Sequence, residues 1–96
     1  MDLSNSLPEI DLHRMTAAQA ERAAARALHT WRVQGVERAV LVTGRGWSNA
    51  RQEPILRTKL EAWLSSAEAR RLGVRAWRRT SKDGALEIAI ARVGED

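Results

Sequence analysis

The sequence predicts a two-layer α/β sandwich with helices packed on a mixed four-stranded sheet. Short apolar or alternating segments, typical of strands, are separated by two longer segments whose apolar residues recur at helical spacing. The element order β-α-β-α-β-β lets the first three strands run parallel through right-handed crossovers. A tight turn at residues 81–84 joins the last two strands, so the fourth strand must be antiparallel.

The composition fits one small domain. At 96 residues we place that domain at residues 8–93, between a loose arm at 1–7 and a tail at 94–96. The chain has no cysteine, which excludes a disulfide framework, and no apolar run approaches the ~20 residues that span a bilayer. The first residues lack the basic start and apolar core of a signal peptide. We expect a cytoplasmic monomer without membrane contact.

The first strand is expected at residues 9–13. Polar and apolar residues alternate there after Pro8, as in a half-buried strand. This alternation puts Asp11 and His13 on one face, about 7 Å apart along the strand.

The first long helix carries signals at both ends. Thr16 and Gln19 fit a capping box, and Gly35 is suited to end the helix. His29 is expected at the surface and Arg32 on one of the wetter faces. The apolar stripe consists of Ala20, Ala24, Ala27, Leu28 and Trp31.

A second strand at residues 36–42 and a second helix at 52–64 follow. The strand is a near-continuous apolar run, as in a parallel strand covered by helices. The helix has Pro54 in its first turn and an apolar stripe at helical spacing. Residues 65–72 are compatible with a longer helix or with a polar connector, and Gly73 ends this stretch.

The last two strands are expected at residues 74–79 and 85–93. Asp83-Gly84 is a strong hairpin signal and predicts a positive φ at Gly84. Simple alternation puts Trp77 on the open face of the sheet, together with Arg75 and Arg79. The helix-facing residues of the last strand are expected to be Leu86, Ile88 and Ile90.

Three loops converge in this topology: the one after His13, the loop at residues 43–48 and the turn at 81–84. The carboxyl ends of parallel strands are where such sheets bind ligands. The middle loop joins a strand to a helix through Gly44, Arg45 and Gly46, whose backbone N–H groups and guanidinium suit an anion. The alternative is a tight turn that needs glycine for geometry alone.

The charge balance favours nucleic acid as the partner. The net charge is +4, the pI is about 11, and 14 of the 16 cations are Arg, which binds phosphate through two parallel hydrogen bonds. Base composition of the genome is an alternative cause of the Arg bias. Phe and Tyr are absent, so base stacking falls to Trp, His or Arg. Trp47 suits either stacking or capping of the core.

Three segments together resemble the Smr domain, the small MutS-related family. That family's pattern runs Leu-Asp-Leu-His-Gly, then Thr-Gly-x-Gly-x-His-Ser, then Gly-Gly-x-Gly-Ala-Leu. The matching stretches here are Ile10-Asp11-Leu12-His13, Thr43-Gly44-Arg45-Gly46 and Asp83-Gly84-Ala85-Leu86, with Leu56-Arg57 and Trp63-Leu64 along the second helix.

The resemblance implies a fold similar to the C-terminal domain of bacterial translation initiation factor three. It also implies nucleic-acid binding, with nicking of DNA or cleavage of RNA in several members. Asp11 and His13 correspond to the residues implicated in cleavage. By resemblance and loop position together, the nucleic-acid-binding residues are Arg14, Thr43, Gly44, Arg45, Gly46, Trp47, Ser48, Lys82 and Gly84.

The chain departs from the family pattern at three places. Arg14 replaces a glycine, and Ser48 and Thr80 stand where the family carries histidines. Binding tolerates these changes more easily than catalysis does. Three functions from different classes therefore stay open: an endonuclease acting on RNA or DNA, a non-catalytic module that binds RNA, DNA or the ribosome, and a structural or protein-interaction domain whose basic surface is incidental.

Asp11 and His13 have one structural and two chemical interpretations. In the structural one they are a hydrogen-bonded pair that closes the strand end. His13 suits the role of acid or base near neutral pH, with Asp11 orienting its ring. Alternatively, Asp11 binds Mg²⁺ and an activated water attacks DNA. We assign no metal ligands from the sequence, because Asp11 has only Glu9 as a second carboxylate on its face.

Overall fold

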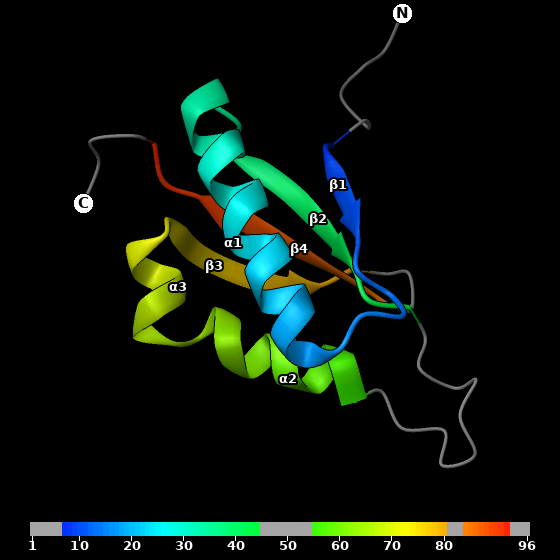
Figure 1. The fold of residues 1–96 in the computed structure, drawn as a ribbon. Helices are drawn as coiled ribbons and strands as arrows, with labels where there is room; N and C mark the ends of the chain where they lie inside the picture. Colours follow the sequence, from blue (N-terminus) through cyan, green and yellow to red (C-terminus); the bar gives the residue numbers. More distant parts are fainter. Residues whose placement is uncertain (1–6, 45–54, 81–83, 93–96) are drawn as a thin grey trace, which may run out of the picture.

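The computed structural model describes residues 7–44, 55–80 and 84–92. These ranges contain four strands and three helices, shown in Figure 1. In chain order they are β1 (Glu9–Asp11), α1 (Ala17–Gln34), β2 (Arg38–Val42), α2 (Ile55–Leu64), α3 (Ala67–Arg71), β3 (Val74–Arg79) and β4 (Ala85–Ile90).

The sheet has the strand order β1-β2-β4-β3. Strands β1 and β2 pair in parallel, and β4 pairs antiparallel with both β2 and β3. The first three strands therefore share one direction and β4 opposes them. The predicted mixed sheet with an antiparallel last strand is confirmed.

The helices form one layer on the sheet, and the core lies between the two layers (Figure 1). Every second side chain of β2 and β4 points toward the helices, and the apolar side chains of α1 recur at helical spacing, so these apolar side chains meet between the layers. The side chains with the largest volumes among those fully buried are Leu12, Leu28, Leu41, Leu60, Leu86 and Ile88. The expected burial of Leu86, Ile88 and Ile90 is confirmed.

Helix α1 begins and ends as its local sequence dictates. The Thr16 hydroxyl accepts from the Gln19 N–H, the Gln19 side chain accepts from the Thr16 N–H, and Gly35 closes the helix with φ 79°. One expectation was wrong: Arg32 is half-buried rather than on a wet face. Its guanidinium donates to the carbonyls of Ala91 and Arg92, which fastens the end of α1 to the segment after β4.

The ambiguous segment at residues 65–72 contains a separate short helix. Ser66 has an extended backbone and its hydroxyl accepts from the Ala69 N–H, so it is the N-cap of α3. The same hydroxyl donates to the Trp63 carbonyl, which marks the break after α2. Residues 52–54 of the predicted second helix lie outside the described residues.

Strand β3 contains a bulge that overturns one expectation. The register shifts between Val74 and Ala76, so Trp77 pairs with Ile88, a residue that faces the helices. The indole of Trp77 donates to the Ser65 hydroxyl at 3.0 Å, at the end of α2. Trp77 therefore does not lie on the open sheet face, because the extra residue in the bulge reverses the alternation.

The strand ends also differ from the expected bounds. β1 ends at Asp11 rather than His13, β2 starts at Arg38 rather than Val36, and β4 ends at Ile90. Among the described residues, no helix combines the length and the apolar character needed to cross a membrane.

Candidate functional site

Asp11 and His13 form a hydrogen-bonded pair at the carboxyl end of β1. The Asp11 Oδ1 atom lies 2.5 Å from the His13 Nδ1 atom and accepts from the His13 backbone N–H at 3.1 Å. The two-residue spacing permits both bonds because Leu12 between them turns into the core. Both side chains are accessible, at 58% for Asp11 and 45% for His13.

The pair has a defined protonation pattern. The side-chain hydrogen bond with His13, supported by its backbone N–H, holds the pKa of Asp11 below the usual value of 3.8. An ionised carboxylate only accepts, so the His13 Nδ1 atom carries the hydrogen. The Nε2 atom is then the nitrogen left for a substrate.

Gly44 of the second motif lies against this pair. Its φ is 79°, and a Cβ atom placed on it would come within 3.0 Å of the His13 Cβ atom. Any larger residue there would be strained and would push against His13. The first two motifs are thus in direct contact.

The third motif supports the second through one carbonyl. The Gly84 oxygen accepts from the backbone N–H of Thr43 at 2.7 Å and of Gly44 at 3.0 Å. The Thr43 hydroxyl, which is buried, also donates to it at 3.2 Å. Gly84 has the positive φ of 79° that its hairpin position predicts. The structure thus brings together the described residues of all three motifs.

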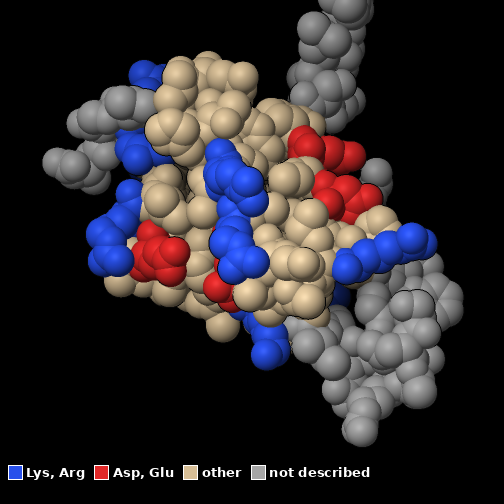
Figure 2. All heavy atoms as spheres, viewed as in Figure 1, with Lys and Arg blue, Asp and Glu red and all other residues tan. Residues whose placement is uncertain are grey.

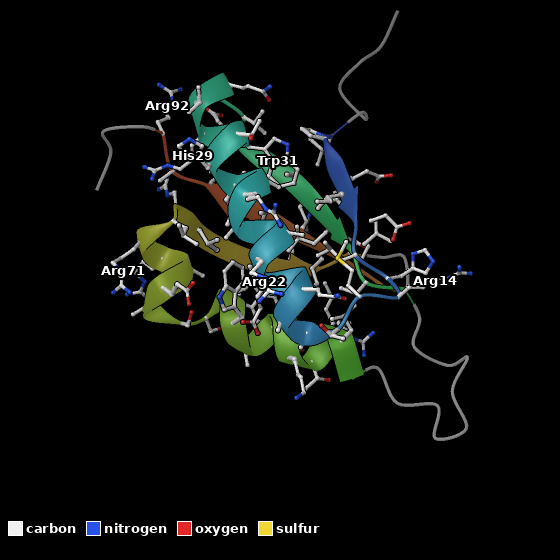
Figure 3. The ribbon with its side chains drawn as sticks, viewed as in Figure 1. Arg14, Arg22, His29, Trp31, Arg71 and Arg92 are labelled. Carbon is white, nitrogen blue, oxygen red and sulfur yellow. The ribbon has the colours of Figure 1, made fainter. Side chains whose placement is uncertain are left out.

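Arg14 lies in the turn between β1 and α1, at the edge of the molecule that carries the pair (Figure 3). Its φ of 76° makes it the one described non-glycine residue with a positive φ. Such a conformation costs a side-chain-bearing residue about 1 kcal/mol or more. Within the described ranges Arg14 takes part in no ion pair, so its charge faces solvent beside His13.

Several predicted binding residues lie outside the described residues: Arg45, Gly46, Trp47, Ser48 and Lys82. The described members of the set are Arg14, Thr43, Gly44 and Gly84. Among the described residues, no three His, Cys, Asp or Glu side chains are grouped closely enough to hold a metal ion.

Charged residues distribute differently over the two faces of the molecule. On the helix layer, Lys and Arg lie in several spots, with Asp and Glu beside some of them and uncharged surface between others (Figure 2). Arg22 and Arg71 belong to this layer and point outward (Figure 3). On the open sheet face, Arg38 and Arg78 both pair with Glu87. Sequence reasoning missed these two arginines as candidates. The alternation along β2 was an available signal for Arg38, whereas simple alternation along β3 puts Arg78 on the helix side, and only the bulge brings it to the open face.

Comparison with known proteins agrees with the motif geometry. The family model of the Smr domain matches residues 10–91. The chain belongs to the Smr domain family. This family is associated with nucleic-acid binding and nicking endonuclease activity. No curated protein matches the chain at a significant level.

Two solved structures share the fold of this Smr domain. The Smr domain of Thermus thermophilus MutS2 is 23% identical, with a TM-score of 0.70 over 88% of this chain and 98% of that one. YdaL, a stand-alone small MutS-related protein from Escherichia coli, is 16% identical, with a TM-score of 0.68 over 93% of this chain and 70% of that one. At such identities the likeness concerns the fold. The expected similarity to translation initiation factor three stays a prediction.

Proposed function

We propose that this Smr domain binds nucleic acid at its three converging motifs and cleaves a phosphodiester bond there, with His13 as the acid–base residue. The observation that carries the proposal is the Asp11–His13 pair, which is exposed, hydrogen-bonded at 2.5 Å and in contact with Gly44. A carboxylate that fixes the tautomer and direction of an imidazole is a recurrent arrangement in acid–base catalysis.

The mechanism follows from the free nitrogen of His13. With RNA, the Nε2 atom takes the proton of the 2′-hydroxyl, whose oxygen attacks the adjacent phosphorus atom. The bond from phosphorus to the 5′-oxygen breaks, and that oxygen takes a proton from water or from a second acid. Arg14 lies beside the pair and stabilises the negative charge that develops on the phosphate.

DNA lacks the 2′-hydroxyl, so nicking would require water as the nucleophile. Mg²⁺, if it takes part, would bind Asp11 through the carboxylate oxygen that His13 leaves free and would supply an activated water. The non-catalytic alternative has support from Thr80, which lies where the family resemblance places a histidine. A site with His13 alone has a base and no second imidazole as acid.

The two histidines of the chain provide the test and its control. His13→Ala is expected to lower the cleavage rate by ~10²–10⁴-fold, because general acid–base catalysis supplies about that factor. His29→Ala, an exposed position on α1, is expected to leave the rate unchanged. The measurement is single-turnover cleavage of labelled RNA and duplex DNA, with nucleic-acid affinity recorded for each variant.

Two further arms identify the reaction. A 2′-deoxy substitution at the cut site stops cleavage if the 2′-hydroxyl attacks, and EDTA stops it if a metal ion takes part. Asp11→Asn costs less than His13→Ala if Asp11 orients the ring. Wild-type protein that binds RNA or DNA tightly and cuts neither, with or without Mg²⁺, would exclude the nuclease and leave the binding module.

A further inference from the structure

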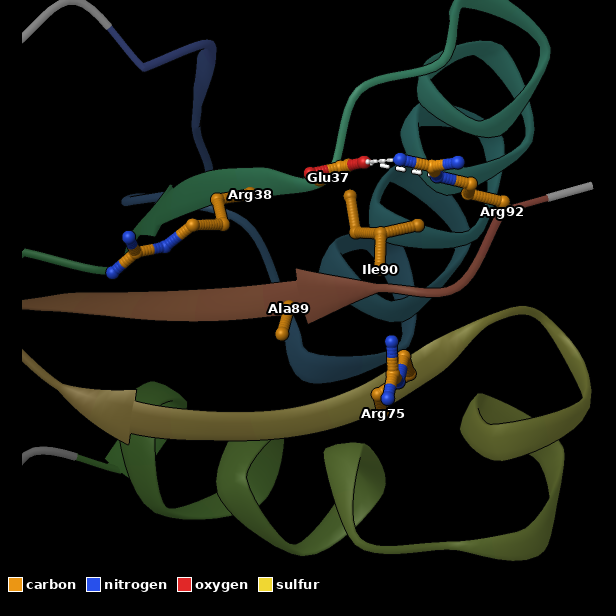
Figure 4. A pocket seen from close by; sticks show the side chains of 6 residues that line it. All are labelled: Glu37, Arg38, Arg75, Ala89, Ile90 and Arg92. Atoms are coloured by element: carbon orange, nitrogen blue, oxygen red, sulfur yellow. Dashed lines mark hydrogen bonds and ion pairs between the residues drawn. The ribbon is translucent and has the colours of Figure 1, made fainter. Parts of the chain in front are cut away.

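The open face of the sheet is hollowed along β4. The larger of two adjoining hollows has a volume of about 280 Å³ and is seen in Figure 4, with the helices behind the strands. The smaller one shares Arg38 and Ala89 with it and continues toward Glu87. We call the two together the open-face groove. Ala76 and Ala89 form its floor, and its walls carry Arg38, Arg75, Arg78 and Arg92.

The backbone explains why this groove is both open and basic. Ala76 pairs with Ala89 across β3 and β4, and two methyl groups side by side keep the floor low. The bulge in β3 leaves Arg75 as the extra residue between Val74 and Ala76, and its side chain lines the larger hollow. The irregularity that turns Trp77 toward the helices therefore also adds a cation to the groove.

The groove lies on the same face as the Asp11–His13 pair. Asp11 pairs with Val42, and Val42, Val40 and Arg38 alternate with the buried residues of β2. Four residue steps along β2, from Arg38 to Val42, span ~13 Å, so Arg38 lies at the far end of this face from the pair. Arg78 is in register with Glu87 and, through it, with Val40, so it lies between them.

We propose that the open-face groove holds the sugar–phosphate backbone of the nucleic-acid strand that is bound at Asp11 and His13. This inference rests on the proposed function and extends it by a second contact region. Guanidinium groups on both walls suit phosphate oxygens, to which they donate two parallel hydrogen bonds. The floor offers the methyl groups of Ala76 and Ala89, so the phosphate contacts of the arginines position the backbone, and contacts to phosphate carry no sequence information directly.

Two glutamates moderate this surface. Glu87 binds Arg38 and Arg78, and Glu37 accepts from Arg92 at 2.8 and 3.0 Å. A phosphate entering the groove competes with these carboxylates for the same donors. Removing the charge of Glu87 is therefore expected to raise affinity, whereas adding a carboxylate to the floor is expected to lower it.

The first test adds one negative charge at matched positions. Ala76→Glu places it on the exposed floor, and Ala67→Glu places it at the exposed start of α3 on the helix layer. Affinity is measured for RNA strands of two and about twelve nucleotides, because the single phosphate that joins two nucleotides cannot contact both regions at once. Ala76→Glu is expected to weaken binding of the longer strand on the order of tenfold and leave the shorter one unchanged. Ala67→Glu is expected to change neither.

The second test is a gain in affinity. Glu87→Gln is expected to strengthen binding of the longer strand several-fold at low salt, with a steeper salt dependence because more phosphates are contacted. Thermal unfolding of each variant verifies that it is folded. If Arg45→Ala weakens binding while Ala76→Glu and Glu87→Gln leave it unchanged, the groove proposal is wrong and the proposed function stands. If the wild-type protein binds no nucleic acid, both are wrong.

Discussion

Each face of the sheet has a glutamate that holds two arginines, and the two arrangements serve different ends. Glu61 on α2 accepts from Arg79 of β3 at 2.6 and 3.1 Å and lies 3.9 Å from the Arg57 Nε atom. Glu87 of β4 pairs with Arg38 of β2 and Arg78 of β3. Both carboxylate side chains are 12% exposed.

The difference lies in what each glutamate connects. Glu61 joins the helix layer to the sheet, so its ion pairs contribute to docking of the two layers. Glu87 joins three neighbouring strands that the backbone already pairs. The ion pairs of Glu61 therefore contribute to stability on the face covered by the helices. Those of Glu87 hold arginines at the accessible surface of the open face. Four predictions test this contrast, from the largest expected effect to the smallest.

Neighbouring residues of β2 give the largest contrast. Leu41 is fully buried under the helices, whereas Val40 is partly exposed on the open face. Leu41→Ala is expected to lower the free energy of unfolding by about 2–5 kcal/mol, because a core cavity remains. Val40→Ala is expected to cost about 1 kcal/mol or less. Urea unfolding measures both, and equal losses would mean that the open face is covered in solution.

The two glutamates are compared directly by removing their charges. Glu61→Gln is expected to cost about 1 kcal/mol, because Arg57, only 20% exposed, then lacks its carboxylate. Glu87→Gln is expected to cost less, because Arg38 and Arg78 are 57% and 68% exposed and remain hydrated. Thermal unfolding at one salt concentration measures the difference. The reverse order would contradict the assignment of Glu61 to layer docking.

Arg14 lies in the turn through which the chain passes from β1 of the sheet to α1 of the helix layer. Arg14→Gly is expected to raise the free energy of unfolding by about 0.5–1 kcal/mol, because glycine adopts a φ of 76° without strain. The same change removes a cation beside His13, so nucleic-acid affinity is expected to fall. A variant that gains stability and keeps full affinity would exclude Arg14 from binding.

The pH dependence of stability is the smallest effect. The hydrogen bond from Arg79 holds the pKa of Glu61 below 4.5, despite burial that acts in the opposite direction. Burial raises the pKa of Glu87, but hydrogen bonds from Arg78 and Arg38 outweigh it and the net shift is downward.

In this range the unfolded state binds more protons than the folded state, so stability rises with pH. The contribution is complete above about pH 5 and is lost as the pH falls through the lowered values. Thermal unfolding between about pH 3 and pH 6 is expected to show this loss, and a smaller loss in Glu61→Gln. A pH profile identical to that of the wild type would contradict the role of Glu61.

Local signals in the sequence predicted much of the fold. The capping box of Thr16 and Gln19, the helix end at Gly35 and the positive φ of Gly84 depend on side chains a few residues apart. Such interactions depend only on neighbouring residues, so the local sequence is enough to predict them. The same reasoning placed Asp11 and His13 near each other, because a two-residue spacing at a strand end leaves little freedom.

Other features depend on distant parts of the chain. The position of β4 between β2 and β3 follows from packing of the whole sheet. The sequence of β4 by itself does not predict this place in the strand order. The bulge between Val74 and Ala76 contains no glycine or proline from which it could be predicted. Because of this bulge, Trp77 and Arg79 face the helices and not the open side. The binding loop was proposed from sequence at residues 43–48, and its residues 45–48 lie outside the described residues.

The place of β4 also bears on how the domain is completed during synthesis. Among the described strands β4 comes after β3 in the sequence, yet it lies between β2 and β3, which do not pair with each other in this sheet. Before residues 84–90 are made, both strands have edges with unpaired N–H and C=O groups. The Gly84 carbonyl, which anchors Thr43 and Gly44 beside His13, is missing at that stage. A ribosome-bound fragment that ends before β4 therefore lacks the hydrogen bonds that hold Thr43 and Gly44 beside His13, and these bonds become possible when β4 inserts between β2 and β3.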